Sequence, residues 1–182
     1  MSRRDRIGAE TRSFASYGRP WLVVIRGPRG MAFDRFLVRR TGFSLVSLQY
    51  ALAGRFPYNP TLLLTTVGRR SGQLRDAALP YVPYGPDLVV VGSKGGGPTD
   101  PAWVVNARHH ELCWIVLRRK TIAVRARVTD GERDPELLAH VVAHKPNVAR
   151  YVERAAGFGR QIPLVVLSAV SGEPLTQGLS RS

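Results

Sequence analysis

Hydrophobic residues recur at helical spacing in the first third of the chain. Phe33, Phe36 and Leu37 are followed by Leu45, Val46, Leu48 and Leu52, with arginines placed between them. This pattern predicts a basic amphipathic helical segment over 31–53. Gly42 interrupts the pattern, so two short helices are expected rather than one long helix. Residues 1–30 combine Arg, Gly and Pro with one short apolar run, and an irregular lead-in is expected there.

Short runs of aliphatic and β-branched residues replace the helical spacing from about residue 58 onward. They predict six strands, over 62–67, 74–84, 88–92, 112–117, 121–129 and 162–167. The clearest run is 121–129, where Ile122, Val124, Ala126 and Val128 alternate with polar residues, as in a strand with one buried face.

Two further helices are expected between these strands. Asp100-Pro101 and Asp134-Pro135 each place a good N-cap before a proline suited to the first helical position. The first helix is expected to end near 109, and Pro146 is expected to end or kink the second. The Gly/Ser/Thr-rich residues after 169 are expected to fray.

Six strands with few interspersed helices predict a mainly β chain of the α+β class, built as a small closed or split β-barrel. The regular βαβ alternation and the GxGxxG fingerprint of a dinucleotide-binding fold are both missing from the sequence. We therefore expect a lead-in over 1–30, a helical segment over 31–57, a barrel domain over 58–168 and a tail over 169–182.

The cysteine, histidine and apolar content of the sequence argues against a disulfide, a metal site and a membrane span. Cys113 is the one cysteine of the sequence, which excludes an internal disulfide and a cysteine-based zinc cluster. His140 and His144 have helical spacing, but no third ligand is evident and no metal is expected. The longest apolar runs hold about five residues, far fewer than the roughly 20 that a membrane span requires, so a cytoplasmic protein is expected.

The positive charge of the chain is compatible with an anionic partner, with solvated surface arginines that bind no partner as the alternative. Lys and Arg number 27 against 13 Asp and Glu, for a net charge of +14, and Lys94, Lys120 and Lys145 are the three lysines. Arginine binds phosphate and carboxylate through a planar fork. Nucleic acid, an anionic membrane surface and a polyanionic small ligand all fit this charge. The aromatic residues that would stack nucleic-acid bases are not apparent on the expected strands.

Two glycine-containing loops are the candidate anion sites. Gly68-Arg69-Arg70-Ser71-Gly72, followed by Arg75, lies between two expected strands, where its amides can form an anion-binding nest. Ser93-Lys94-Gly95-Gly96-Gly97 follows a strand, and its glycines allow a ligand to approach the backbone. An ordinary charged hairpin turn and a plain flexible loop are the alternatives.

An aromatic and an amide side chain follow these loops. Trp103 and Asn106 are three residues apart on an expected helix, so they share a face that suits a planar heterocycle. Core packing of Trp103 is the alternative. The chain offers few acid–base groups, which fits chemistry supplied by a cofactor.

The two glycine-containing loops, followed along the chain by Trp103 and Asn106, resemble motifs of the deazaflavin (coenzyme F420)-dependent nitroreductase and quinone reductase family. The resemblance covers about residues 58–168. It implies a flavin-reductase-like split β-barrel with an N-terminal helical extension. It also implies an oxidoreductase that passes a hydride from reduced F420 to a quinone, an enone, a nitro compound or a similar electrophile.

The resemblance also implies roles for single residues. Arg69, Arg70 and Arg75 would hold the phosphate and the glutamate tail of the coenzyme. Ser93, Lys94, Gly95 and Gly96 would line the phosphate and the ring edge, and Trp103 and Asn106 would shape the pocket behind them. Tyr151 is the candidate proton donor, with solvent as the alternative. The family's nitro-reducing members have a tyrosine-rich stretch where this chain has 145–151, in which Tyr151 is the one aromatic residue.

Three alternatives stay open at this point. Flavin mononucleotide (FMN) would fit the same groove of the same fold. A basic protein without catalytic activity would bind nucleic acid or a membrane surface. The family's link to membrane-borne quinones makes residues 31–53 a candidate for peripheral membrane contact at the inner face of the membrane. The oligomeric state is not indicated.

Overall fold

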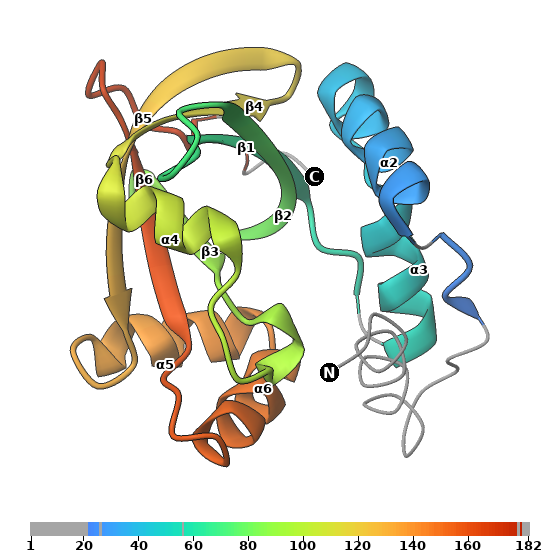
Figure 1. Cartoon of the computed structure of the whole chain (residues 1–182), viewed down its shortest axis with the longest axis vertical. Coiled ribbons are helices and arrows are strands. Elements are labelled where there is room, and N and C mark those ends of the chain that lie inside the picture. The colour runs from blue at the N-terminus through green and yellow to red at the C-terminus, as the bar shows by residue number, and fades with distance from the viewer. Residues whose placement is uncertain (1–21, 26, 56, 178, 180–182) are drawn as a thin grey trace.

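The computed structural model describes residues 22–25, 27–55, 57–177 and 179. Its centre is a closed barrel of antiparallel strands in the order β1-β2-β3-β6-β5-β4 (Figure 1). The strands are β1 (Thr61–Val67), β2 (Leu74–Tyr84), β3 (Asp87–Val91), β4 (Leu112–Leu117), β5 (Lys120–Asp130) and β6 (Pro163–Ala169). The expected six-stranded barrel and α+β class are confirmed.

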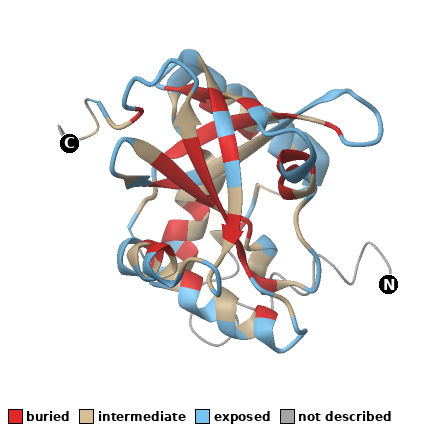
Figure 2. Ribbon diagram, turned by 90° about the vertical axis from the view of Figure 1, so that its left-hand side faces the viewer, coloured by how far each residue is buried: buried red, intermediate tan, exposed pale blue. Residues whose placement is uncertain are grey.

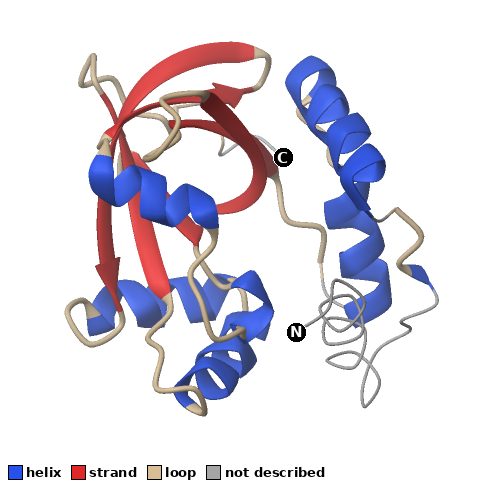
Figure 3. Cartoon of the chain, in the orientation of Figure 1, coloured by secondary structure: helices blue, strands red, loops and turns tan. Residues whose placement is uncertain are grey.

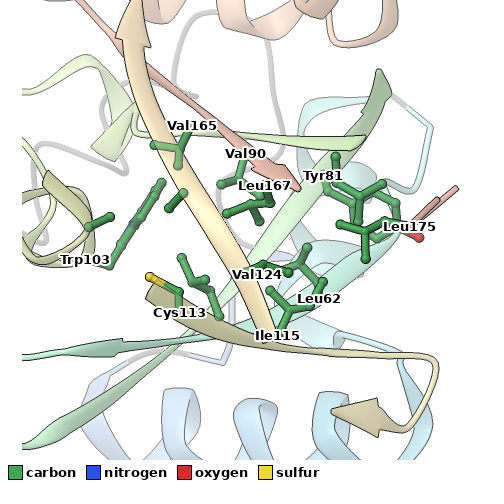
Figure 4. Close-up of a cluster of buried hydrophobic side chains, with 14 of the residues drawn as sticks. Leu62, Tyr81, Val90, Trp103, Cys113, Ile115, Val124, Val165, Leu167 and Leu175 are labelled. Atoms are coloured by element: carbon green, nitrogen blue, oxygen red, sulfur yellow. The ribbon is translucent and has the colours of Figure 1, made fainter. Parts of the chain in front are cut away.

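Alternate residues of each strand face the inside and the outside of the barrel. Leu62 and Leu64 of β1 point into the interior, where they join Ile115, Val124 and Leu167 from other strands (Figure 4). The buried residues run along the barrel strands in Figure 2. The interior is therefore a packed hydrophobic core.

Outward-facing residues of the same strands bind the helices. Leu63 and Val116 pack against Val38 of α2 (Gly27–Thr41). On another side, Val89 and Val166 pack against α5 (Pro135–His144) and α6 (Asn147–Ala156). The paired helices α2 and α3 (Leu45–Gly54) thus lie beside the barrel, and α5 and α6 lie below it in the view of Figure 3.

Two segments cover the ends of the barrel. Trp103, Val104 and Ala107 of α4 (Ala102–His109) join the interior cluster at one end, and Leu175 joins it at the other (Figure 4). The Leu175 amide donates to the Pro86 carbonyl at 2.8 Å. The expectation that the chain frays directly after 169 is therefore wrong, because a buried leucine anchors the segment.

The helical segment before the barrel agrees with the sequence pattern in its main feature. Two helices form, and Gly42, with φ +75°, separates them. Helix α2 begins at Gly27, four residues before the expected start. Asp34 of α2 is buried and accepts hydrogen bonds from the Ser44 hydroxyl (2.8 Å) and the Val46 amide (3.0 Å), which joins the two helices. Residues 1–21 of the expected lead-in lie outside the described residues.

Helix α6 was not expected from the sequence, because Pro146 was interpreted only as a terminator or a kink. Proline is compatible with the start of a helix, and here Pro146 has helical φ/ψ angles of −56° and −26° directly before α6. Val148 and Ala155 of the new helix are buried. The stretch expected between the last helix and the last strand is thus itself mostly helical.

Candidate functional site

An open groove of about 520 Å³ lies between the β1–β2 turn and helix α4. The turn contributes Arg69, Arg70 and Arg75 to its wall, and α4 contributes Trp103 and Asn106. The structure therefore brings together five of the nine residues that were predicted to bind the coenzyme.

The glycines of the turn are required by its geometry. The Gly68 amide donates to the Gln73 carbonyl at 2.9 Å, and the Gly72 amide donates to the Gly68 carbonyl at 2.8 Å. A Cβ atom on Gly68 would lie 2.9 Å from the Ser71 hydroxyl oxygen, which leaves no room for a side chain. Gly72 has φ +65°, the left-handed region that glycine enters without strain.

Positive charge dominates the turn. Arg69 and Arg70 are exposed, and within the described part of the chain neither forms an ion pair. Arg75 donates to the Gln73 side-chain oxygen at 2.9 Å. Asp76 also lines the groove, but its carboxylate accepts hydrogen bonds from Arg39 (2.8 Å) and Thr65 (2.7 Å). The groove thus offers free guanidinium groups to a ligand.

Asn106 holds the turn in place. Its side-chain oxygen accepts from the Arg69 amide at 3.1 Å, and its side-chain nitrogen donates to the Thr66 hydroxyl at 3.1 Å. The residue is 8% exposed. We predicted that Asn106 would shape the pocket, and the structure gives it a specific means of doing so. It ties helix α4 to the backbone that carries the arginines.

Trp103 is both a core residue and a wall of the groove. It is 9% exposed and packs in the barrel interior at the end covered by α4. The two interpretations considered from the sequence are therefore compatible, because one large ring reaches both the core and the groove surface.

The second predicted loop lies outside the lining of the groove. Ser93, Lys94, Gly95 and Gly96 form the turn between β3 and α4 that contains the short helix η2 (Lys94–Gly96). Ser93 has right-handed helical angles, whereas Lys94, Gly95 and Gly96 have φ values of +46°, +65° and +71°. The step from right-handed Ser93 to left-handed Lys94 is the backbone pattern of anion-binding nests, whereas the Gly96 and Gly97 amides donate to carbonyls of the loop itself.

The Lys94 side chain is directed along its own loop. Its amine donates to the Thr99 hydroxyl at 2.8 Å. Asp100, expected to cap helix α4, does not do so: Pro101 is the N-cap and makes no side-chain cap bond. The Asp100 carboxylate instead accepts from Arg160 (2.8 Å) and from Arg108.

Arg160 is a residue of this region that sequence reasoning missed. Its side chain is 8% exposed and donates to the carbonyls of Gly92 (2.6 Å), Ser93 (3.1 Å) and Gly97 (2.8 Å). No local motif marks it, because its partners lie between 60 and 68 positions earlier in the sequence.

Tyr151, the predicted proton donor, lies on α6 and does not line the groove. It lies beside the second loop, because a Cβ atom on Gly96 would come within 2.8 Å of the Tyr151 carbonyl oxygen. Its catalytic role stays a prediction.

Burial also shifts the pKa of titratable groups away from the groove, among them Lys145 and Cys113. Desolvation lowers the pKa of Lys145 to about 7, where the junction of α5 and α6 buries the residue to 6% exposure. Desolvation also raises the pKa of the buried Cys113 thiol to about 11, which keeps the thiol in its unreactive protonated form.

A flat ring with a phosphate and an oligoglutamate tail fits these residues. Its anionic part needs cationic side chains without partners of their own, and Arg69 and Arg70 meet that need at the edge of the groove. Its ring needs an apolar wall, and Trp103 supplies one.

Comparison with known proteins adds independent findings. The sequence model of the F420H(2)-dependent quinone reductase family matches residues 39–169. An F420H(2)-dependent quinone reductase of Mycobacterium tuberculosis strain H37Rv is 29% identical over 147 residues, covering 76% of this chain and 99% of the relative.

Solved structures give the same result for the fold. A structure of an F420-H2-dependent reductase is similar with a TM-score of 0.52 and 28% identity, over 60% of this chain and 94% of the other. A second structure, described as a domain-swapped dimer, has a TM-score of 0.53 and 25% identity over 75% of this chain and 94% of the other.

Proposed function

The chain belongs to the F420H(2)-dependent quinone reductase family, and on this basis we propose that it reduces a quinone with reduced coenzyme F420. The family resemblance drawn from the sequence is confirmed, as are the oxidoreductase class and the coenzyme. FMN, nucleic acid and a purely non-catalytic role are not favoured by these findings.

The observation that carries this function is the pair of unpaired guanidinium groups at the edge of an apolar groove. When bound, the coenzyme supplies a hydride. Arg69 and Arg70 would bind its phosphate and tail carboxylates, and Arg75 would add charge beside them. Trp103 would support the ring. Holding the coenzyme at contact distance from the acceptor removes much of the entropic barrier to transfer.

The reduced quinone must also gain a proton. We propose Tyr151 as its donor, because Tyr151 lies on α6 directly against the loop of Ser93 to Gly96. Solvent is the alternative source. A Tyr151→Phe variant would lower kcat but leave the affinity for F420 unchanged if the hydroxyl donates the proton.

Helix α2 is proposed to contact a membrane surface. The outer face of α2 carries Phe33 (54% exposed) and Phe36 (56% exposed), with Arg40 stacked over the Phe36 ring at 5.6 Å. Exposed aromatic rings next to arginines are typical of peripheral contact with anionic lipid. No helix in the described part of the chain is long and apolar enough to span a bilayer. We propose peripheral contact at the inner face of the membrane, where apolar quinones reside.

Titration of the purified protein with F420 tests the coenzyme site. Arg69→Ala and Arg70→Ala should each weaken binding by up to about fivefold, since an exposed charge contact contributes up to about 1 kcal/mol. Arg133→Ala is the matched control, because Arg133 is 79% exposed and pairs with Asp130 away from the groove. Saturable binding that neither groove variant weakens would contradict the proposed site, and absence of binding would contradict the function.

A further inference from the structure

Arg160 is buried, and burial of its charged guanidinium carries a desolvation cost. It follows Gly159, whose φ of +66° ends the turn after α6, and its side chain is 8% exposed. An arginine is rarely buried unless its donors are satisfied. Here Asp100 supplies the counter-charge and backbone carbonyls supply the remaining acceptors.

The three carbonyls come from one loop. Those of Gly92, Ser93 and Gly97 all converge on the terminal nitrogens of Arg160, at distances between 2.6 and 3.1 Å. The Nε atom donates to Asp100, which precedes Pro101, the N-cap of α4. One planar guanidinium thus fixes both ends of the loop that was predicted to bind phosphate.

Neighbouring elements leave this loop little freedom. A Cβ atom on Gly92 would lie 2.7 Å from Val104 and from Pro163. A Cβ atom on Gly96 would lie 2.8 Å from the Tyr151 carbonyl oxygen and 3.0 Å from Arg154. The loop backbone therefore packs against α4, α6 and the start of β6, while Lys94 stays exposed.

This arrangement sets the direction of the loop backbone. The carbonyls of Gly92, Ser93 and Gly97 turn toward Arg160, while the Gly96 and Gly97 amides donate to the Ser93 and Lys94 carbonyls. The right-handed Ser93 followed by the left-handed Lys94 gives the backbone pattern of an anion nest. Lys94 is a non-glycine residue with φ +46°, a conformation that persists only where the surroundings enforce it.

We propose that Arg160 is a positioning residue that presents the loop of Ser93 to Gly96 to the phosphate of the coenzyme. Asp100 is the second part of this device, because its carboxylate binds both Arg160 and Arg108. This inference rests on the proposed function, and it adds a residue that touches neither the ring nor the acceptor.

The test compares two ligands. One is F420, and the other is the deazaflavin nucleoside, which has the ring but neither phosphate nor glutamate tail. Arg160→Met should weaken the binding of F420 by about tenfold or more and weaken the binding of the nucleoside by a clearly smaller factor, because the nucleoside meets the loop only at the ring edge and lacks the phosphate. Arg160→Lys keeps one charge–carboxylate contact and should restore part of the affinity for F420.

A merely structural role predicts a different result. General loosening of the fold would weaken both ligands by the same factor, and that outcome would overturn the proposal, as would unchanged F420 binding in folded Arg160→Met. If Arg160→Met does not fold, Asp100→Asn replaces it, because that variant removes the counter-charge that orients the Arg160 guanidinium toward the loop. A loss that is clearly larger for F420 than for the nucleoside supports the proposal there, and an equal or absent loss overturns it.

The controls separate this inference from the proposed function. Arg133→Met removes an arginine of the same size from an exposed site and should leave the affinity for both ligands at the wild-type value. Wild-type protein that binds neither ligand would overturn the proposed function. If the wild type binds F420 but the Arg160 variants lose affinity for both ligands equally, or for neither, only the proposed role of Arg160 would be overturned.

Discussion

Arg39 of α2 donates a 2.8 Å hydrogen bond to the carboxylate of Asp76, an acidic residue in the wall of the groove. The side chains are 50% and 30% exposed. This ion pair joins the helical segment to the barrel. It also neutralises a charge that would repel an anionic ligand.

Removal of Arg39 should therefore weaken coenzyme binding although Arg39 does not line the groove. We expect Arg39→Ala to raise the Kd for F420 by up to about fivefold, since exposed pairs contribute up to about 1 kcal/mol. The double variant Arg39→Ala with Asp76→Asn should return the Kd close to the wild-type value. Titrations at low and high salt give the measurement, and a double variant as weak as the single one would contradict this explanation.

Loss of the Asn106 amide should loosen the arginine turn. Asn106→Ala leaves the Arg69 amide and the Thr66 hydroxyl without their partner, which costs about 1–3 kcal/mol of stability for a buried group. Denaturant unfolding measures this loss, and F420 titration should show weaker binding. Asn106→Gln keeps an uncharged amide oxygen that can accept from the Arg69 amide and should bind F420 better than Asn106→Ala. Equal affinities for the two variants would show that the contact with the turn is unimportant.

The aromatic face of α2 should control binding to lipid. We expect Phe33→Ser with Phe36→Ser to reduce co-sedimentation with vesicles that contain anionic phospholipid, because two exposed rings are lost from the contact. Phe158→Ser is the matched control, since Phe158 is 55% exposed but follows α6. Binding of the wild type to neutral vesicles should be weaker. A control variant that loses as much binding as the α2 variant would argue against this surface.

Lys145 should make stability depend on pH. Its folded pKa of about 7 lies below the ordinary value of 10.5, so the unfolded chain binds more protons between these values. Stability should therefore rise as the pH increases from about 7 to 10.5, and the cost of burial is fully present below about pH 7. Lys145→Met should raise the free energy of unfolding more at pH 6 than at pH 10. Denaturant titrations at both pH values measure the difference, and an equal gain would show that the wild-type amine is not desolvated.

The strands could be predicted from the sequence because their signal is local. The alternation of Ile122, Val124, Ala126 and Val128 reflects one strand with two different faces, and β5 forms over that run. Asp134 was likewise recognised as an N-cap, and its carboxylate accepts from the Leu137 amide at 3.2 Å. Helix α6 was missed because proline both ends and begins helices, so Pro146 alone did not distinguish the two.

The candidate site could be predicted only in part, because some of its residues have a local sequence signal and others do not. The position of Arg69 and Arg70 between two glycines identifies them as candidates from the sequence alone. The residues that hold the loops do not, because Asn106 contacts a turn 37 positions away and Arg160 contacts Gly92 across 68 positions. Leu175 likewise packs against the barrel next to Pro86. Such contacts depend on the closed barrel, which no short pattern encodes.

The filled interior of the barrel has a consequence for how relatives of this chain diversify. Leu62, Leu64, Ile115 and Leu167 are completely inaccessible, so selection for packing governs the lumen. The proposed coenzyme-binding residues lie on a turn and a helix at the rim of the barrel, and such surface segments tolerate exchange and lengthening without disturbing that packing. New acceptor preferences can therefore evolve by replacement of rim segments other than the β1–β2 turn and α4, while the strands keep their register.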